Sequence, residues 1–457
     1  MRELLARAAR DDYDAWLTSA VATGGCTHPV RLKGEVAEIT PSGELLALHE
    51  TTDRPDGILY TSCGNRREAV CPACSAVYKR DAYHLIRSGL AGGKGVPETV
   101  AHHLALFVTL TAPSFGVVHT RRTAKNGRQI PCRPRRNREL CRHGRDISCP
   151  RVHREDEKCL GKPLCPDCYD YAGAVVWNAH APELWRRTMI GFRRILDRHA
   201  KRHGVKVQVR YAKVAEFQAR GLVHFHALVR LDGHDPDGAI IPPPLEITAD
   251  DFKAALMQAV HATWFATLDH PAKPGGWDIA WGDQTEIRQV AVSGDGEITD
   301  GHVASYLAKY ATKSTETVGA VSRRITEANL DIYAPPHTHL GRLTRAAWTL
   351  GDHDHDTFRA LRRWAHMLGF RGHFTTKSRR YSTTFKALRT ARQTWRRRQH
   401  RTAELAEGEE STLVLGLLTY AGTGWRTHGD ALLALTAAAK AREYAEVARE
   451  EIACMAG

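Results

Sequence analysis

The stretch Gly221-Leu-Val-His-Phe-His-Ala-Leu-Val-Arg230 alternates in the manner of a β-strand. Because every second side chain of a strand faces the same way, His224 and His226 share one face, and Phe225 points into a core. Two imidazoles held side by side can bind one metal ion. The alternative is that both histidines are polar residues on a half-exposed strand, since a His-x-His pair is a weak signal by itself.

A second alternating segment, Lys213-Val-Ala-Glu-Phe-Gln218, precedes the histidines and is separated from them by Ala219-Arg-Gly221. Three residues ending in glycine are typical of a β-hairpin loop whose last residue is left-handed. This loop sets the register of the two strands and places Glu216 opposite His224, on the histidine face. A carboxylate and two imidazoles suit Mg²⁺, Mn²⁺ or a similar divalent ion better than a structural zinc.

Residues 301–313 are predicted to form a helix that carries two tyrosines and two lysines on one face. Tyr306 and Tyr310 are four residues apart, as are Lys309 and Lys313. One interpretation is an amphipathic helix with packed tyrosine rings and lysine amines that reach the solvent. The other is a tyrosine nucleophile for phosphodiester attack, with lysines that hold phosphate and favour the phenolate.

Three motifs stand in a fixed order along the chain: the apolar strand Phe107-Val-Thr-Leu-Thr111, the pair His224-Phe-His226, and Tyr306-x-x-x-Tyr310. In this order they resemble the HUH superfamily of metal-dependent DNA nicking enzymes that use a tyrosine nucleophile. The resemblance implies an α+β HUH endonuclease fold, in which the metal-binding hairpin lies at the centre of an antiparallel sheet and the tyrosine helix lies over it.

A closer resemblance extends over nearly the whole chain, to rolling-circle replication initiators of actinomycete (Streptomyces-type) plasmids and integrative elements. The stretches that carry it are Cys63-Gly-Asn-Arg-Arg67, Gly89-Leu-Ala-Gly-Gly-Lys-Gly-Val-Pro97, Leu164-Cys-Pro-Asp-Cys-Tyr-Asp-Tyr171 and Trp364-Ala-His-Met-Leu-Gly-Phe370. Such an initiator nicks origin DNA at a specific site, leaving a 5′-phosphotyrosine and a free 3′-OH that primes replication, and it rejoins the strand at termination.

The resemblance also implies roles for the residues already singled out. Glu216, His224 and His226 would hold a catalytic Mg²⁺ or Mn²⁺. Tyr310 would attack phosphorus, and Tyr306 would make the second cleavage when the replication fork returns. An unperturbed phenol has a pKa of ~10, so the metal and either Lys309 or Lys313 would assist its ionisation.

The composition agrees with a nucleic-acid partner. The 457 residues include 65 Lys and Arg against 51 Asp and Glu, a formal charge of +14, which favours a polyanionic partner. No apolar run is long enough to span a membrane, and the charged N-terminus is no secretory signal. We therefore expect a cytoplasmic protein that binds no membrane. The resemblance to rolling-circle initiators implies the particular partners: origin DNA, as a single-stranded or hairpin region with flanking duplex, and the host helicase and DNA polymerase.

Ten of the eleven cysteines lie before residue 169, and Cys454 stands alone. In a reducing compartment such a cluster indicates metal more than disulfides. The motifs Cys71-Pro-Ala-Cys74 and Cys165-Pro-Asp-Cys168 can each offer two thiolates to a tetrahedral structural zinc. The alternative is that these are reduced, buried cysteines.

Two structural zinc ions are therefore expected. For the first, Cys26 and Cys63 are the remaining pair beside Cys71 and Cys74. For the second, Cys132 and Cys141 are chosen to join Cys165 and Cys168. The sequence leaves open several other partners for the second ion: His143, Cys149, His153 and Cys159.

The chain is expected to divide by sequence order into three regions. Residues 1–100 would bind zinc, residues 101–315 would form the HUH catalytic domain with residues 113–175 as a zinc-binding insertion, and residues 316–457 would form a helical, basic DNA-binding region. Within the catalytic domain the pattern predicts helices over 182–203 and 249–268 and strands over 205–217, 222–231 and 278–292. Alternating strands and helices of this kind indicate an α+β fold with an antiparallel sheet.

The stretch 371–401 contains eleven Lys or Arg and no Asp or Glu, with aromatic residues interleaved. Cations that follow phosphates and rings that stack on bases form a surface for a DNA strand; the alternative is a solvated basic helix. The residues chosen for DNA contact are Arg371, Lys377, Arg379, Arg380, Tyr381 and Lys386.

Other functions share parts of this pattern. A conjugative relaxase or an HUH transposase would use the same chemistry on a different DNA. A non-catalytic zinc protein that regulates by binding DNA belongs to another class, and it would not depend on Tyr310.

Overall fold

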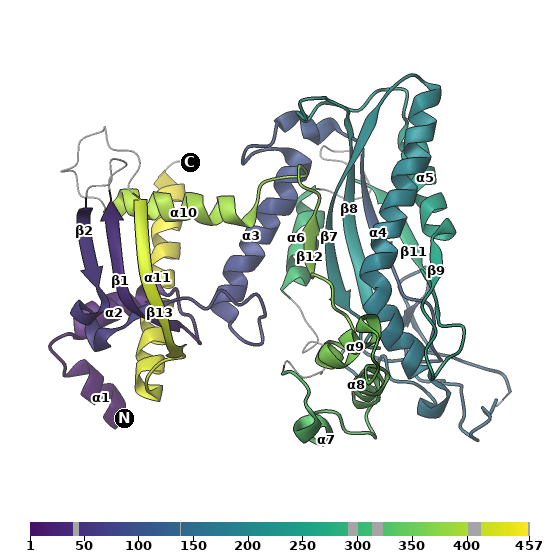
Figure 1. The fold of residues 1–457 in the computed structure, drawn as a ribbon, viewed down its shortest axis with the longest axis horizontal. Helices are drawn as coiled ribbons and strands as arrows, with labels where there is room; N and C mark the ends of the chain where they lie inside the picture. Colours follow the sequence, from purple (N-terminus) through teal and green to yellow (C-terminus); the bar gives the residue numbers. More distant parts are fainter. Residues whose placement is uncertain (40–44, 138, 291–299, 313–322, 401–412, 456–457) are drawn as a thin grey trace. The chain divides into compact units, whose positions relative to one another are not determined.

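The structure is a computed structural model that describes residues 1–39, 45–137, 139–290, 300–312, 323–400 and 413–455. It divides into two compact units (Figure 1). Unit 1 joins Met1–Asp81 to Thr384–Gly457, and unit 2 is Ala82–Thr383. These units do not follow the order of the chain, so their boundaries differ from the expected ones at residues 100 and 315. The C-terminal segment belongs with the N-terminal one because β13 (Leu413–Thr423) pairs with β1 (Val30–Ile39).

Unit 1 is built on β1, which is flanked by β13 and β2 (Leu45–Glu50) and also pairs with β3 (Leu59–Thr61). Its helices are α1 (Arg2–Ala8), α2 (Tyr13–Ala22), the first part of α3 (Pro72–Ala91), α10 (Phe385–His400) and α11 (His428–Met455). Its small core gathers Trp16, Tyr60 and Ala434 around the half-buried Trp425.

Unit 2 is built on an antiparallel sheet with the strand order β11-β4-β8-β7-β12. The strands are β4 (Ala105–Leu110), β7 (Val207–Phe217), β8 (Val223–Gly233), β11 (Thr285–Gln289) and β12 (Thr375–Lys377). Its main helices are α4 (Tyr171–Arg202), α5 (Ala249–Ala262), α6 (Asp300–Ala311), α7 (Leu330–Tyr333), α8 (His339–Leu350) and α9 (Asp356–Arg363). The short strands of unit 2 are β5 (Arg122–Thr123), β6 (Gln129–Ile130), β9 (Trp264–Ala266) and β10 (Asp278–Ala280), and its 3-10 turns lie at Glu98–His102, Pro166–Cys168, Glu327–Asn329 and Ala365–Met367. The 3-10 turns at Thr51–Asp53 and Pro55–Gly57 belong to unit 1. The fold is α+β with a central antiparallel sheet, as expected.

The two faces of this sheet have different neighbours. Helices α4 and α5 run along one face (Figure 1), where Phe225 packs against Trp185 of α4. Helix α6 contacts the other face, where Phe107 and His226 meet Tyr306. The strand alternation inferred from the sequence therefore separates a core face from a site face.

Several element ends differ from expectation for local reasons. Helix α4 begins at Tyr171 rather than 182, because the Asp170 carboxylate accepts a hydrogen bond from Gly173 N and caps the helix. Helix α5 ends at Ala262, and the chain continues into β9. The C-terminal residues form helices as expected, with the strands β12 and β13 added.

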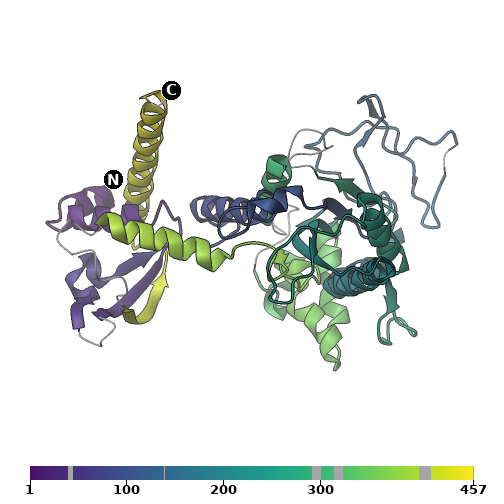
Figure 2. The ribbon, with the colours of Figure 1, turned by 90° about the horizontal axis from the view of Figure 1, so that it is seen from above.

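Residues 113–170, which we call the insertion, connect β4 to α4. Figure 2 shows much of this segment as irregular chain, and its only strands among the described residues are the two-residue β5 and β6. Across the described parts of both units, no helix combines the length and apolar character needed to cross a membrane.

Candidate functional site

The predicted register of the hairpin is confirmed. Glu216 of β7 stands opposite His224 of β8. At the turn, Gln218 N donates to Leu222 O at 2.9 Å and Gly221 N donates to Gln218 O at 2.8 Å. Gly221 has φ +77°, the left-handed conformation that favours glycine. The turn therefore fixes which side chains of the two strands share the site face.

His226 lies at the centre of the candidate site. Its Nε2 is 3.4 Å from a carboxylate oxygen of Glu216, and its Nδ1 is 3.1 Å from Thr109 Oγ1 on β4. A hydroxyl that accepts the Nδ1–H leaves Nε2 with a lone pair for a metal ion. Thr109 was not singled out from the sequence, although it alternates with Phe107 on the apolar strand and therefore falls on the same face.

His224 is oriented from the other side. Its Nδ1 is 3.1 Å from Gln218 Nε2, and Arg220 Nε donates to Gln218 Oε1 at 3.0 Å. Burial lowers the pKa of His224 to about 3, with the neighbouring His226 and Arg220 charges acting in the same direction. His224 is therefore neutral at physiological pH, which is the protonation state that a metal ligand needs.

The donor set fits a divalent ion chemically, with one carboxylate and two imidazoles on one face. The His224 and His226 ring centroids are 4.5 Å apart. The ligand atoms of this hairpin lie farther apart than those of the cysteine-bearing groups described below. In the described part of the chain, all the groups with ligand atoms within 4.8 Å of one another lie outside this hairpin. The residues that would hold the ion are Glu216, His224 and His226, of which Glu216 and His226 already approach each other to 3.4 Å.

Both tyrosines of α6 lie over these histidines. The Tyr310 ring stacks on His226 with centroids 5.4 Å apart and 27° between the planes. The Tyr306 ring meets His226 edge-on at 5.1 Å and Tyr310 at 4.6 Å. Partial burial and the hydrogen bond to Tyr310 raise the pKa of Tyr306, so Tyr306 stays a phenol. Lys309 is exposed on the same helix, and Lys313 lies outside the described residues.

The first expected zinc group is brought together in unit 1. Cys26, Cys63, Cys71 and Cys74 place their sulfur atoms within 4.8 Å of one another. The Cys63 amide N donates to Cys26 Sγ at 3.3 Å. Hydrogen bonding from the Cys74 thiol lowers the pKa of Cys26 to about 5. A four-cysteine set of this kind is typical of structural zinc.

The second expected group changes in membership. The structure gathers Cys141, His143, Cys165 and Cys168, with His143 Nδ1 at 3.2 Å from Cys168 Sγ. Cys132 lies elsewhere, in a group with His119, Cys149 and His153. The set of Cys132, Cys141, Cys165 and Cys168 is therefore corrected: His143 takes the place of Cys132, because the turn that carries Cys141 also brings His143 to the Cys165–Cys168 motif.

Two of the residues chosen for DNA contact are structural. Tyr381 is fully buried and its hydroxyl donates to Ile86 O at 3.0 Å, so its ring cannot stack on a base. Lys377 Nζ donates to three backbone carbonyls, those of Ser378, Arg379 and Ser382. The other four are exposed: Arg371, Arg379, Arg380 and Lys386. Of the six, Lys386 belongs to unit 1 and the rest to unit 2.

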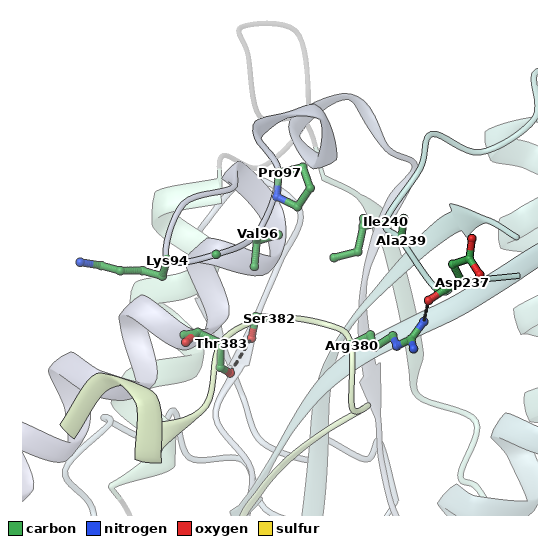
Figure 3. Close-up of a pocket in the computed structure, with 11 residues that line it drawn as sticks. Lys94, Val96, Pro97, Asp237, Ala239, Ile240, Arg380, Ser382 and Thr383 are labelled. Carbon is green, nitrogen blue, oxygen red and sulfur yellow. Dashed lines mark hydrogen bonds between the residues drawn. The ribbon is translucent and has the colours of Figure 1, made fainter. Parts of the chain in front are cut away.

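Figure 3 shows a pocket of unit 2 that Arg380 lines together with Ser382, Thr383 and the segments 94–97 and 237–240. Arg380 Nη1 donates to Asp237 O at 3.5 Å, and a side chain on Gly238 would overlap the guanidinium. In Figure 3 the Lys94 amine points away from Arg380. The pocket shares no lining residue with the histidine and tyrosine site.

Comparison with known proteins places the chain among replication initiator proteins. A replication initiator protein of Streptomyces ambofaciens is 41% identical over 469 residues, covering 98% of this chain and 95% of the relative. The particular family follows. The chain belongs to the RepSA family, described as "Replication initiator protein, pSAM2", which matches residues 12–439. No solved structure matches.

Proposed function

We propose that this chain initiates replication by nicking origin DNA through a tyrosine nucleophile, in the rolling-circle manner of the HUH endonucleases. The observation that carries the proposal is the stacking of Tyr310 on His226, 5.4 Å between ring centroids, above the Glu216–His226 pair. A nucleophile, a candidate metal-binding pair and an orienting hydroxyl thus meet on one sheet face. Membership of a replication initiator family agrees with an origin-specific activity.

The proposed reaction is phosphotyrosyl transfer. The Tyr310 oxygen forms a bond to phosphorus, and the bond from phosphorus to the 3′-oxygen of the preceding nucleotide breaks. The 3′-oxygen takes up a proton and becomes the 3′-OH that primes a polymerase, while the 5′-phosphate stays on Tyr310. One phosphodiester replaces another, so rejoining at termination needs no ATP. A divalent ion held by Glu216, His224 and His226 would polarise the scissile phosphate.

Tyr310 must lose its proton for this attack. The neighbouring phenol of Tyr306 stays protonated and can donate a hydrogen bond to a Tyr310 phenolate. The Lys309 ammonium, one residue before Tyr310, adds positive charge on the same helix. Tyr306 is also the candidate for the second cleavage at termination.

The rest of the molecule is assigned to DNA binding and to structure. The exposed Arg371, Arg379, Arg380 and Lys386 are proposed to contact phosphates of the origin. The two groups that contain Cys71–Cys74 and Cys165–Cys168 are proposed to hold structural zinc. A host helicase and a DNA polymerase would act on the nicked product.

Incubation with supercoiled plasmid that carries the cognate origin, with Mg²⁺ or Mn²⁺, tests the proposal. Wild-type protein should give open circles and a covalent protein–DNA adduct on denaturing gels. Tyr310→Phe should lose both while it keeps origin binding in a mobility-shift assay. Tyr306→Phe is the comparison variant: it keeps the Tyr310 hydroxyl and should still nick once and form the adduct, but more slowly, because it loses the hydrogen bond to the Tyr310 phenolate.

Two outcomes would redirect the proposal. An adduct that persists in Tyr310→Phe and disappears in Tyr306→Phe would reassign the nucleophile. Origin binding without any nicking by the wild-type protein would favour the other class of function, a zinc protein that regulates by binding DNA.

A further inference from the structure

The insertion lacks an apolar core of its own. Between His119 and Cys168 every residue except 138 is described, and the buried ones are Cys132, Cys149, His153, Gly161, Pro163 and Cys165. None of them is Leu, Ile, Val, Phe or Met. A loop-rich segment of about fifty residues with no buried aliphatic side chain needs another source of stability, typically disulfides or metal. All its cysteines are free thiols, so metal is the remaining source.

We propose that His119, Cys132, Cys149 and His153 bind a third zinc ion, separate from the two ions assigned above. Their four ligand atoms lie within 4.8 Å of one another, three of the residues are buried and His119 is half-buried. His153 Nε2 is 3.2 Å from His119 Nδ1 and 3.4 Å from Cys149 Sγ. Two sulfur and two nitrogen atoms, all from the protein, match a closed structural zinc site.

The backbone around this group is shaped to hold thiolates. Arg133 and Cys149 exchange two hydrogen bonds of 2.8 Å, and Cys132 N donates to Arg151 O at 2.9 Å. These bonds bring the two cysteines together from positions seventeen residues apart. Thr120 N donates to Cys132 Sγ at 3.2 Å, as a backbone amide does to a negatively charged sulfur.

Glu157 is assigned as a positioning residue for His153. Its Oε2 is 2.8 Å from His153 Nδ1, and Arg154 N donates to its Oε1 at 3.0 Å. A carboxylate on one ring nitrogen holds the imidazole with the other nitrogen toward the metal. Cys159 lies on the carboxylate side of the ring, where its thiol donates to Glu157 Oε2 at 3.4 Å. Cys159, Glu157 and His153 Nδ1 make a competing set with three donors rather than four.

The third site also reaches the hairpin through the backbone of His119. His119 N donates to Lys162 O, and Gly161 N donates to His119 O, both at 2.9 Å. Gly161 has φ +79°, and a Cβ there would overlap the backbone between Ala219 and Arg220. A ligand of the third zinc thus holds Gly161 against the turn that sets the register of Glu216 and His224. This coupling rests on the proposed function, whereas the zinc site itself does not.

Metal analysis of the full-length protein tests the site. Wild type should carry three zinc ions per chain, and Cys149→Ser should carry two. Cys159→Ser is the matched control and should keep three, because its sulfur is not a ligand. Glu157→Gln should keep three ions at saturation but release one of them to a chelator at 10–100-fold lower chelator concentration. Tyr310→Phe protein should also carry three zinc ions per chain. Because this variant is not expected to nick DNA, its zinc content tests the third site independently of the proposed function.

A content of two zinc ions in the wild type would overturn the proposal. This measurement does not depend on the variant, so it remains decisive even if Cys149→Ser fails to fold. Loss of an ion in Cys159→Ser with none lost in Cys149→Ser would place the metal on the competing set. For the coupling, hydrogen exchange at the amides of Gln218 and Gly221 should quicken in Cys149→Ser and stay unchanged in Cys159→Ser, while the amides of α5 stay protected in both. Unchanged exchange at the turn in a Cys149→Ser protein that has lost one zinc would refute the coupling.

Discussion

Replacing Thr109 by valine separates a metal-binding role of His226 from a packing role. Valine keeps the shape and the β-branching of threonine, but it deletes the oxygen that lies 3.1 Å from His226 Nδ1. If His226 binds a metal ion through Nε2, its Nδ1–H donates to this oxygen and the ring orientation depends on it. If His226 only packs between Phe107 and Tyr310, the hydroxyl matters little to the site.

The metal-binding role and the packing role predict different effects of Thr109→Val: the first lowers metal affinity, and the second lowers only folding stability. Loss of the partner that orients a metal-bound histidine lowers metal affinity or activity by about 10–100-fold, which corresponds to ~1.4–2.8 kcal/mol. Loss of an ordinary buried hydrogen bond costs ~1 kcal/mol of folding stability and leaves the metal requirement unchanged. We therefore expect the Mn²⁺ concentration for half-maximal nicking by Thr109→Val to rise about 10–100-fold, with the maximal rate largely recovered at saturating Mn²⁺.

The assay is nicking of supercoiled origin plasmid against Mn²⁺ concentration, with thermal unfolding followed in parallel. Thr111→Val is the matched control, because the Thr111 hydroxyl donates to Gln284 O at 2.8 Å rather than to His226. It should lose a similar amount of stability and keep the wild-type metal midpoint. A wild-type midpoint in Thr109→Val would refute the assignment of His226 Nε2 as a ligand.

Three further predictions address the hairpin, the first zinc group and the core. Glu216→Ala should raise the Mn²⁺ requirement for nicking with little loss of fold, whereas Glu246→Ala, which removes an exposed carboxylate from the turn before α5, should not. An unchanged titration in Glu216→Ala would place the third ligand elsewhere. Cys71→Ser should lose one zinc by elemental analysis and lower the stability of unit 1; active protein that contains no zinc would contradict this. Burial lowers the pKa of Lys213 to about 7, below the ~10.4 of an unfolded lysine, so the unfolded chain binds more protons and stability should rise between about pH 7 and ~10. Lys213→Met should abolish that rise in urea unfolding measured at pH 6, 8 and 10, and a variant that keeps the slope would show that another group causes it.

The parts of the site that could be predicted from the sequence are the local ones. A three-residue loop fixes hairpin register over a few residues, so the pairing of Glu216 with His224 followed from spacing alone. The position of α6 over the hairpin came from family resemblance, because no spacing rule links elements some eighty residues apart. Thr109 was missed since a threonine on an apolar strand is ordinary until its neighbour across the sheet is known.

The parts that could not be predicted depend on long-range packing. The pairing of β1 with β13 joins segments separated by nearly the whole chain, and the sequence of neither strand identifies the other as its partner. The basic, aromatic stretch near Tyr381 has the composition of a DNA surface, yet the ring is buried under Arg230 and Gly89. The cysteine and histidine partners of the insertion were too numerous for spacing to decide, because turns rather than regular elements bring them together.

The pairing of β1 with β13 has a consequence during synthesis. Unit 2 is continuous in sequence and can fold while the chain is still being made. In unit 1, β1 can pair with β2 and β3 early, but its other edge has no partner until residue 423 has left the ribosome. Some 340 residues separate Asp81 from the end of β13, which at 5–20 residues per second is a delay of roughly 20–70 s. Through that interval the first strand of unit 1 exposes an unpaired edge. We expect the nascent N-terminal segment to be a chaperone client, and the four-cysteine zinc group, complete by residue 74, to be what gives it early order.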